Sequence, residues 1–225
     1  MFDYFFSWID DPINTLIFFL LAFPGRIIAL SVHEFAHAWM ANRCGDPTAK
    51  YMGRMTLNPL KHLDFWGTVM MIFLGYGWAK PVPVNSRYYK KPKLGMALTA
   101  LAGPVVNILL AFVGVILSTA SINLLYIGSI DPQLVMIIYE FFLCFALINI
   151  YFAVFNLIPI PPLDGSRIAF IFLPDRIYFG LMRYEQYIKL GLLLMLYMGV
   201  LDRPLDFITG HLLNGMYWLT SLVML

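Results

Sequence analysis

Three ionisable residues stand close together inside the first long apolar stretch of the sequence. They are His33, Glu34 and His37, and they follow the pattern His-Glu-x-x-His. On a helix, residues four apart lie on one face, so the two imidazoles could bind one zinc ion. Glu34 lies beside that face, close enough to accept a proton from a water molecule at the metal. The pattern therefore predicts the metal site of a zinc-dependent hydrolase.

A catalytic zinc ion usually has three protein ligands and one open position, so a third ligand is expected. Asp164 is favoured because it follows residues 156–163, whose three prolines forbid a regular helix. Such backbone occurs at membrane depth only where protein or water surrounds it. A simpler alternative is that Asp164 caps a turn with Gly165. The other ionisable residues in or beside the later apolar stretches are Glu140, Glu185, Asp202, Asp206 and His211.

Two asparagines are candidates for contact with the reacting carbonyl group. Asn107 follows Gly103-Pro104 by one helical turn, inside an apolar stretch. Its amide could donate to a developing oxyanion or hold a substrate carbonyl. An ordinary hydrogen bond between helices is an equally good explanation. Asn156, at the start of the proline-rich segment, is the second candidate for the oxyanion or substrate role.

The composition predicts the environment in which these residues act. The chain has 225 residues, of which 60% are hydrophobic and only 12% are charged, and its mean hydropathy is +0.76. Soluble proteins carry about 25% charged residues. We therefore expect an all-α, multi-pass integral membrane protein. The net charge of +2 is small and dispersed, which excludes a nucleic-acid-binding protein.

Apolar stretches indicate the membrane segments that position the site. They cover residues 13–41, 65–79, 96–124, 134–157 and 187–225. A membrane crossing needs about 20 residues, so residues 65–79 are too short and are expected to form a re-entrant or interfacial segment. Asp202-Arg203-Pro204 should break the last stretch into two shorter segments. We expect a single domain over residues 1–225, with a core at about 13–167 and C-terminal membrane segments at about 187–225.

The basic residues predict the orientation of the chain in the membrane. Nine of the 15 lie between Arg43 and Lys93, and four lie between Arg167 and Lys189. The connection around Asp131 has none, and the N-terminus is acidic. The positive-inside rule places the two basic regions in the cytoplasm. The metal site is therefore expected within the membrane, towards its cytoplasmic side.

Together, the three motifs resemble the site-2 protease family of intramembrane zinc metalloproteases, in particular its small prokaryotic members built almost entirely from the core. The matching segments are residues 33–37, 103–107 and 156–165, in the same order as in the family. The resemblance implies one zinc ion per chain and a site-2 protease-like transmembrane helical core. In the family, the positions matching His33, His37 and Asp164 bind zinc, and the position matching Glu34 is the general base.

The resemblance also implies a substrate class and a location. Substrates would be single-span membrane proteins, cut within or next to their transmembrane segments, and the protein would lie in a prokaryotic cell (inner) membrane, in contact with the lipid bilayer. No PDZ domain or soluble regulatory domain is expected, and the sequence leaves the oligomeric state open. The alternative function is a membrane metal-ion transporter or metal-binding protein, because such proteins also place His and Asp in membrane spans. One compact ligand set, with Glu34 displaced from the histidines, favours the enzyme.

Three further features have plain explanations. Residues 75–84 could present an edge strand to a substrate, but a loop anchored at the membrane interface is the better expectation. His62 and His211 are expected to be surface or interfacial residues rather than metal ligands.

Overall fold

The computed structural model describes residues 11–74, 77–127, 130–174 and 183–223, together with residues 177 and 180. This part of the chain is helical and contains no strand, which confirms the all-α prediction. Short 3-10 turns, η1 (Pro59–Lys61), η2 (Ser86–Tyr88), η3 (Leu124–Ile127) and η4 (Phe170–Phe172), separate or extend the helices. The α-helices are α2 (Pro12–Arg43), α3 (Thr48–Tyr51), α4 (Phe65–Leu74), α5 (Pro92–Asn123), α6 (Pro132–Asn156), α7 (Asp164–Ala169), α9 (Glu185–Tyr197) and α10 (Asp202–Val223).

Among the described residues, three helices are long and apolar enough to cross a membrane. They are α2, α5 and α6, and they coincide with three of the predicted apolar stretches. Large apolar side chains remain exposed along them, such as Leu20, Leu109 and Ile137, which are 51–60% accessible. Exposed apolar surface along every long helix is expected where lipid replaces water as the solvent.

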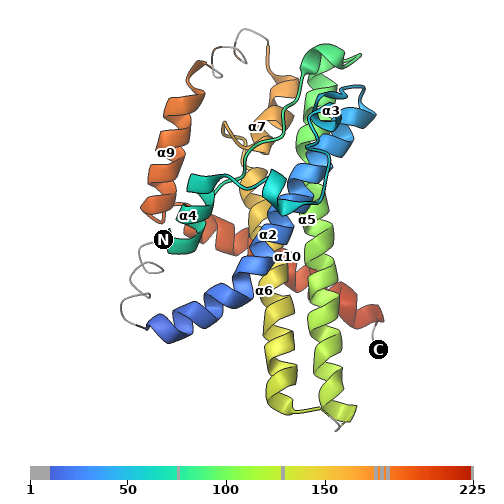
Figure 1. Ribbon diagram of the computed structural model, residues 1–225, viewed down its shortest axis with the longest axis vertical. Helices are drawn as coiled ribbons and strands as arrows, with labels where there is room; N and C mark the ends of the chain where they lie inside the picture. The colour runs from blue at the N-terminus through green and yellow to red at the C-terminus, as the bar shows by residue number, and fades with distance from the viewer. Residues whose placement is uncertain are drawn as a thin grey trace.

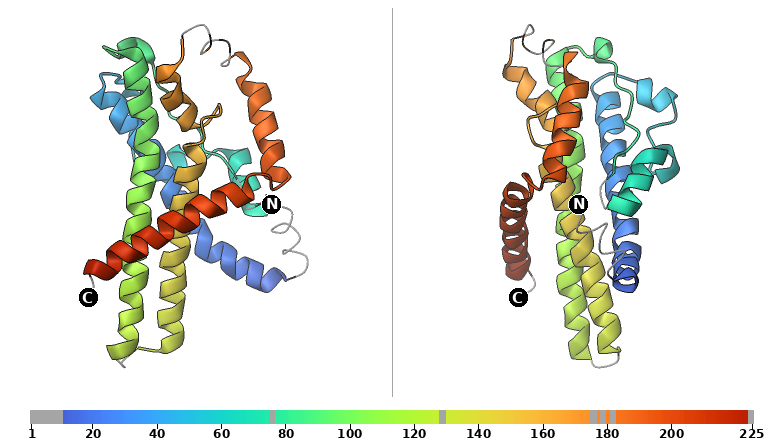
Figure 2. Two further views of the ribbon diagram at one scale, coloured as in Figure 1. Left: turned by 180° about the vertical axis from the view of Figure 1, so that it is seen from behind. Right: turned by 90° about the vertical axis from the view of Figure 1, so that its left-hand side faces the viewer.

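The long helices pack in layers around the α5–α6 hairpin. These two antiparallel helices form the centre of the molecule (Figure 1), with α2 on one face and α10 crossing obliquely on the other (Figure 2). Small residues allow the close approach of helices in a membrane. A Cβ atom at Gly25 of α2 would lie 3.4 Å from the Phe145 ring of α6, and one at Gly114 of α5 would lie 3.0 Å from Ala146.

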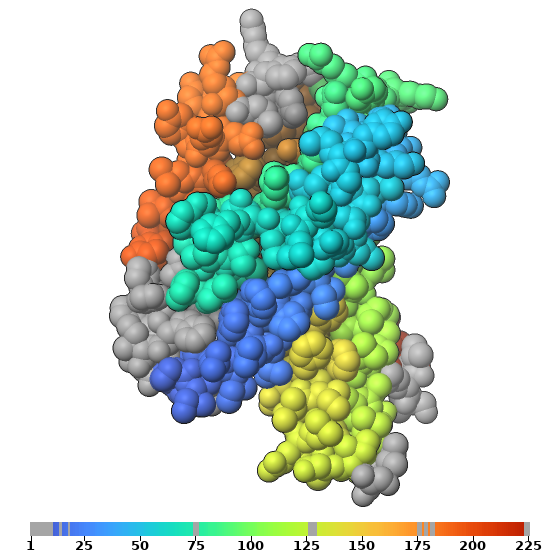
Figure 3. Space-filling view, in the orientation of Figure 1, coloured from blue at the N-terminus to red at the C-terminus, as the bar shows by residue number. Residues whose placement is uncertain are grey.

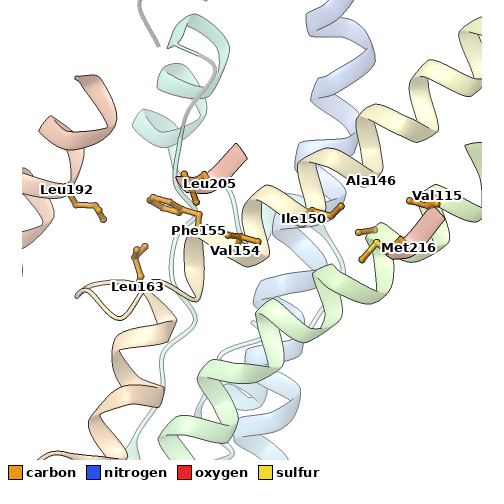
Figure 4. Close-up of a cluster of buried hydrophobic side chains, with 10 residues drawn as sticks. Val115, Ala146, Ile150, Val154, Phe155, Leu163, Leu192, Leu205 and Met216 are labelled. Carbon is orange, nitrogen blue, oxygen red and sulfur yellow. The ribbon is translucent and has the colours of Figure 1, made fainter. Parts of the chain in front are cut away.

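A buried apolar cluster joins α10 and α9 to this hairpin. Figure 4 shows that the cluster follows α6 from Ala146 to the chain segment that leaves this helix, where Phe155, Leu163, Leu192 and Leu205 lie. Leu163, which directly precedes Asp164, belongs to this cluster. Packing of Leu163 therefore fixes the position at which α7 begins. The cluster consists of Ala111, Val115, Ala146, Ile150, Val154, Phe155, Leu163, Leu192, Leu205 and Met216.

Helix α4 forms one limb of a tight turn in which the chain reverses direction. It has only ten residues, so it cannot cross a membrane. Trp78 returns directly against Gly67, where a side chain would collide with the Trp78 carbonyl group, and an isolated antiparallel bridge joins Leu63 to Ala79. The chain thus comes back to the level at which α4 begins. This agrees with the re-entrant or interfacial segment predicted for residues 65–79.

The chain between α2 and α5 covers the upper half of α2. In Figure 3, residues of this connection lie across the front of the molecule, above the exposed N-terminal half of α2. The described part of the possible edge strand, residues 77–84, contains no helix or strand and carries only the isolated Leu63–Ala79 bridge, so it is a loop, which was the better expectation. Residues 75 and 76 lie outside the described chain. Near the C-terminus the last apolar stretch is broken into two helices, as predicted, but the break lies at residues 198–201 and the predicted Asp202-Arg203-Pro204 are the first residues of α10.

Candidate metal centre

His33, His37 and Asp164 come together although 131 positions separate the first from the last. The two Nε2 atoms lie 2.9 Å apart, and Asp164 Oδ2 lies 3.1 Å from His33 Nε2 and 3.2 Å from His37 Nε2. Ligand atoms bound at about 2.0–2.1 Å around a tetrahedral zinc ion lie roughly 3.3 Å from one another. The three atoms are therefore spaced as zinc ligands. They form the one group of potential metal ligands among the described residues.

Hydrogen bonds on the far side of each ring show why a cation fits here. His37 Nδ1 lies 2.7 Å from the Thr99 carbonyl oxygen, and His33 Nδ1 lies 2.6 Å from Asn107 Oδ1. Both partners can only accept, so both Nδ1 atoms carry protons and both Nε2 atoms present lone pairs. The two Nε2 lone pairs and the Asp164 carboxylate oxygen therefore point towards one another, and none of the three atoms carries a proton. A zinc ion satisfies all three.

The fold brings Asp164 to the histidines by turning the chain back after α6. Helix α6 ends at Asn156, residues 157–163 are not helical, and Asp164 is the first residue of α7. Gly165 lies against the carbonyl group of Leu157 at the end of α6, where any side chain would collide. The proline-rich segment and Gly165 therefore make the tight return. Asp164 faces the two imidazoles, so the structure favours the ligand over the turn-capping alternative.

Asn107 orients His33 through a chain of buried amides. Its Nδ2 group donates to Asn149 Oδ1 at 2.8 Å and to the Ala29 carbonyl oxygen at 3.2 Å. With both amide hydrogens used, Oδ1 must face His33 Nδ1. Asn149 is held in turn, because its Nδ2 donates to the Phe145 carbonyl oxygen at 2.9 Å. Both asparagines are fully buried, so Asn107 makes the helix-to-helix hydrogen bonds that the sequence left as one alternative.

Replacing Asn107 with leucine should weaken zinc binding. The change keeps the approximate volume but removes the acceptor for His33 Nδ1, and loss of a hydrogen-bond partner of a ligand typically costs about 10- to 100-fold in metal affinity. Competition with a chromophoric chelator would measure the zinc Kd. Asn123→Leu, at the far end of the same helix, is the matched control and should bind zinc as the wild type does. Equal affinities of Asn107→Leu and the control would contradict the role given to Asn107.

Thr99, whose carbonyl group accepts from His37, also contacts a neighbouring tyrosine through its side chain. Thr99 lies in the first turns of α5, and its Oγ1 atom lies 2.9 Å from the Tyr89 hydroxyl. Tyr89 is buried, and this burial raises the pKa of its phenol to about 12. The phenol therefore keeps its proton and remains a donor at every physiological pH.

Gly103 leaves the space that the two imidazoles fill. A Cβ atom there would lie 2.5 Å from His33 Cε1 and 2.6 Å from His37 Cε1. We expect Gly103→Ala to push both rings out of place and to abolish stoichiometric zinc binding, as measured by metal analysis of the purified protein. Gly191→Ala, where nothing lies within 4 Å of the added atom, is the control for a glycine change inside a helix. Full zinc occupancy of Gly103→Ala would show that the rings tolerate the displacement.

Glu34 lies beside the metal ligands without being one of them. It is buried, and its Oε2 atom accepts a hydrogen bond of 2.9 Å from the Val82 backbone N–H. No described residue donates to Oε1. A cavity of about 1430 Å³ contains Glu34, the three ligands and Asn156 in its wall. Glu34 therefore has one oxygen held by the Val82 N–H and lies in the wall of the same cavity as the three metal ligands.

The remaining candidates lie apart from the metal group. Asn156 donates from Nδ2 to the Phe152 carbonyl oxygen at 2.9 Å and faces the cavity. His211 is exposed, as predicted. The expectation of a surface or interfacial His62 is wrong. His62 is fully buried, and its Nε2 atom donates a hydrogen bond to the Thr56 carbonyl oxygen, which offsets the cost of burying the imidazole. Glu140, Glu185 and Asp202 line the cavity, but neither they nor Asp206 belong to the metal group.

Sequence reasoning missed two parts of the site. Asn149 could have been found, since an amide inside the apolar stretch that becomes α6 needs a partner as much as Asn107 does. The Val82 contact uses a backbone N–H, which has no signature in the sequence. Both support other residues rather than bind the metal, so a search for metal ligands alone does not find them.

Comparisons with known proteins agree with this centre. Residues 18–198 match the family model described as Peptidase family M50. The Bacillus subtilis (strain 168) protein named "Putative zinc metalloprotease YwhC" is 41% identical over 165 residues, which are 72% of this chain and 73% of that protein. The Mycolicibacterium smegmatis protein named "Putative zinc metalloprotease Rip2" is 30% identical over 68% of this chain and 58% of that protein. No solved structure matches the chain. Because the family match includes all three metal ligands, the chain belongs to peptidase family M50, the multi-pass intramembrane zinc metalloproteases whose substrates are membrane proteins.

Proposed function

We propose that Glu34 is the general base of peptide hydrolysis at this centre. The observation that carries the proposal is the position of its carboxylate, which shares a cavity wall with all three metal ligands but is not in the ligand group. A zinc ion held by His33, His37 and Asp164 would supply Lewis-acid catalysis. It would polarise a carbonyl group and lower the pKa of water, so that water can lose a proton and attack at neutral pH. Glu34 accepts a proton from the attacking water and passes it to the leaving amine.

The cavity and the membrane helices support a proposal for the substrate class. The cavity extends from the metal ligands along α2, α6 and α9, and apolar side chains such as Leu147, Leu193 and Leu196 make up much of its wall. We propose that it takes a transmembrane segment of a single-span membrane protein in a locally extended form, since a helix hides its peptide bonds. The bond cut would lie within that segment or next to it.

Asn156 is the better supported candidate for contact with the substrate carbonyl. Its amide lines the cavity and uses one hydrogen for the Phe152 carbonyl group, which leaves one donor. Both amide hydrogens of Asn107 serve Asn149 and Ala29. The oxyanion role of either residue stays a prediction. It is tested by Asn156→Leu, which should lower kcat without changing zinc content.

We propose an orientation that places the metal centre towards the cytoplasm of a prokaryotic cell. The C-terminal end of α2, which is Arg43, and the lysine-rich start of α5 lie at one end of the molecule, and the connection between α5 and α6 lies at the other (Figure 1). His33 and His37 belong to the C-terminal half of α2. The positive-inside rule supports this direction. Residues 1–225 would act as one membrane domain.

The test of the proposed function compares cleavage with metal transport. The protein is reconstituted in liposomes with a model single-span substrate, stripped of metal with a chelator and then reloaded with zinc. We expect cleavage that disappears on stripping and returns with about one zinc ion per chain. If no membrane substrate is cut while zinc accumulates inside the liposomes, the protein is a transporter.

A further inference from the structure

Three buried polar side chains outside the membrane-spanning helices have no part in the metal group. Asp46 and His62 are fully buried, and Arg54 is only 8% exposed. Burying such groups is costly unless they make specific hydrogen bonds. All three lie in the connection between α2 and α4, and all three residues contact the same short piece of chain, residues 80–85, which we call the strap.

Each of these residues holds a different point of the strap. The Asp46 carboxylate accepts from the Asn85 N–H at 2.6 Å. The backbone carbonyl group of His62 accepts from the Lys80 N–H at 2.8 Å. Arg54 Nη2 donates to the Lys80 carbonyl oxygen at 2.6 Å and reaches the Pro81 carbonyl oxygen at 3.4 Å. The strap is thus fixed at both ends, and Arg54 holds the two carbonyl groups immediately before Val82.

Within the described chain, one hydrogen bond joins the strap to the site, and that bond goes to Glu34. Val82 donates its N–H to Glu34 Oε2. The residues on either side, Pro81 and Pro83, have no N–H and a fixed φ, so the sequence Pro-Val-Pro presents one donor from a stiff backbone. The same prolines, together with the Arg54 contacts, leave the strap few free groups for pairing with another strand.

We propose that Arg54 is a positioning residue for the catalytic base, acting through the strap. Arg54 fixes the carbonyl groups of Lys80 and Pro81, these fix the direction of the Val82 N–H, and the N–H fixes the rotation of the Glu34 carboxylate. With Oε2 held, Oε1 remains available to accept the proton. The inference rests on the proposed role of Glu34. It explains why an arginine that touches no metal ligand is buried beside an active site.

The decisive experiment measures kcat, KM and zinc affinity separately, in proteoliposomes with the model single-span substrate. Arg54→Met keeps the apolar stem but removes the donors. We expect its kcat to fall about 10- to 100-fold, since a misplaced catalytic group can cost about 100-fold, while KM and the zinc Kd stay near the wild-type values. Arg54→Lys, which keeps a cation able to reach one carbonyl group, should recover part of the rate. Lys50→Met, an exposed cation on α3, is the matched control with wild-type kinetics.

A second variant tests the contact itself. Val82→Pro removes the N–H while leaving every Arg54 contact in place. It should lose kcat to a similar extent, and the double variant with Arg54→Met should lose little more, because both changes break one chain of contacts. If Arg54→Met does not fold, Arg54→Lys and Val82→Pro decide the question.

Several results would overturn the proposal. They are an unchanged kcat in Arg54→Met or Val82→Pro, a rise in KM with kcat intact, or a fall in rate that follows a loss of zinc. A rise in KM alone would make the strap a substrate-binding element. Failure of the proposed function looks different, because the wild-type protein itself would then cut nothing.

Discussion

Glu34→Gln should retain its zinc and lose cleavage by at least about 100-fold. Glutamine has nearly the same shape and still accepts from the Val82 N–H, but it cannot accept a proton from water at neutral pH. General bases contribute about 100- to 10,000-fold to a reaction rate. Glu34 is not in the metal group, so zinc should stay bound. Metal analysis and single-turnover cleavage of the model substrate, on the same preparation, measure both quantities.

The control for this variant is Asp131→Asn, which also removes one carboxylate. Asp131 caps α6 by accepting from the Gln133 N–H at 2.8 Å, at the end of the molecule away from the metal centre. Asparagine caps helices about as well as aspartate, so activity should be unchanged. If Glu34→Gln cuts as fast as Asp131→Asn, another group is the base. If it loses zinc as well, Glu34 helps to build the metal centre and the loss of activity says nothing about proton transfer.

Asp164→Ala is expected to weaken metal binding more than the loss of any hydrogen-bond partner of a ligand does. It removes one of three donors and leaves the two histidine nitrogens alone, so the loss in zinc affinity should exceed the roughly 10- to 100-fold that removal of a ligand's hydrogen-bond partner costs. Cleavage should fall with zinc occupancy and recover in part when zinc is added in excess. Isothermal titration of the metal-stripped protein measures the affinity directly.

Asp206→Ala is the matched control for Asp164. Both residues are carboxylates that the sequence offers as a third ligand, but Asp206 lies on an exposed position of α10, outside the metal group. Its removal should leave zinc affinity and cleavage unchanged. Tight, stoichiometric zinc binding by Asp164→Ala would disprove the ligand set. Loss of zinc in Asp206→Ala would point to a different third ligand.

The membrane helices were predictable because hydrophobic length alone determines them. Helices α2, α5 and α6 differ from the predicted stretches only at their ends, where Pro92 and Pro132 begin α5 and α6. The short re-entrant helix α4 followed from the same length argument. Asp164 was predictable for another reason, since an irregular, proline-rich segment in apolar sequence must be buried in protein, and a carboxylate buried there needs a cation.

The sequence could not predict contacts that depend on the rotation of one helix against another or on the path of the backbone in a loop. The direction of the Asn107 amide is set by Asn149 on another helix, 42 positions away. The burial of His62 depends on where the loop returns over Thr56, and a histidine between Lys61 and Leu63 gives no sign of it. The Val82 contact involves a backbone group that every residue except proline possesses. Such features require the folded chain.

The distribution of the metal ligands and their partners over four helices links metal binding to the stability of the fold. His33 and His37 belong to α2 and Asp164 to α7, while Asn107 and Asn149 extend the contacts to α5 and α6. A ligand that binds only the folded state stabilises it by about 2.7 kcal/mol at a hundred times its Kd. Zinc should therefore act as a cross-link between the helices and raise the melting temperature in proportion to the logarithm of its free concentration. When zinc is scarce, the folded protein should therefore be less stable as well as inactive.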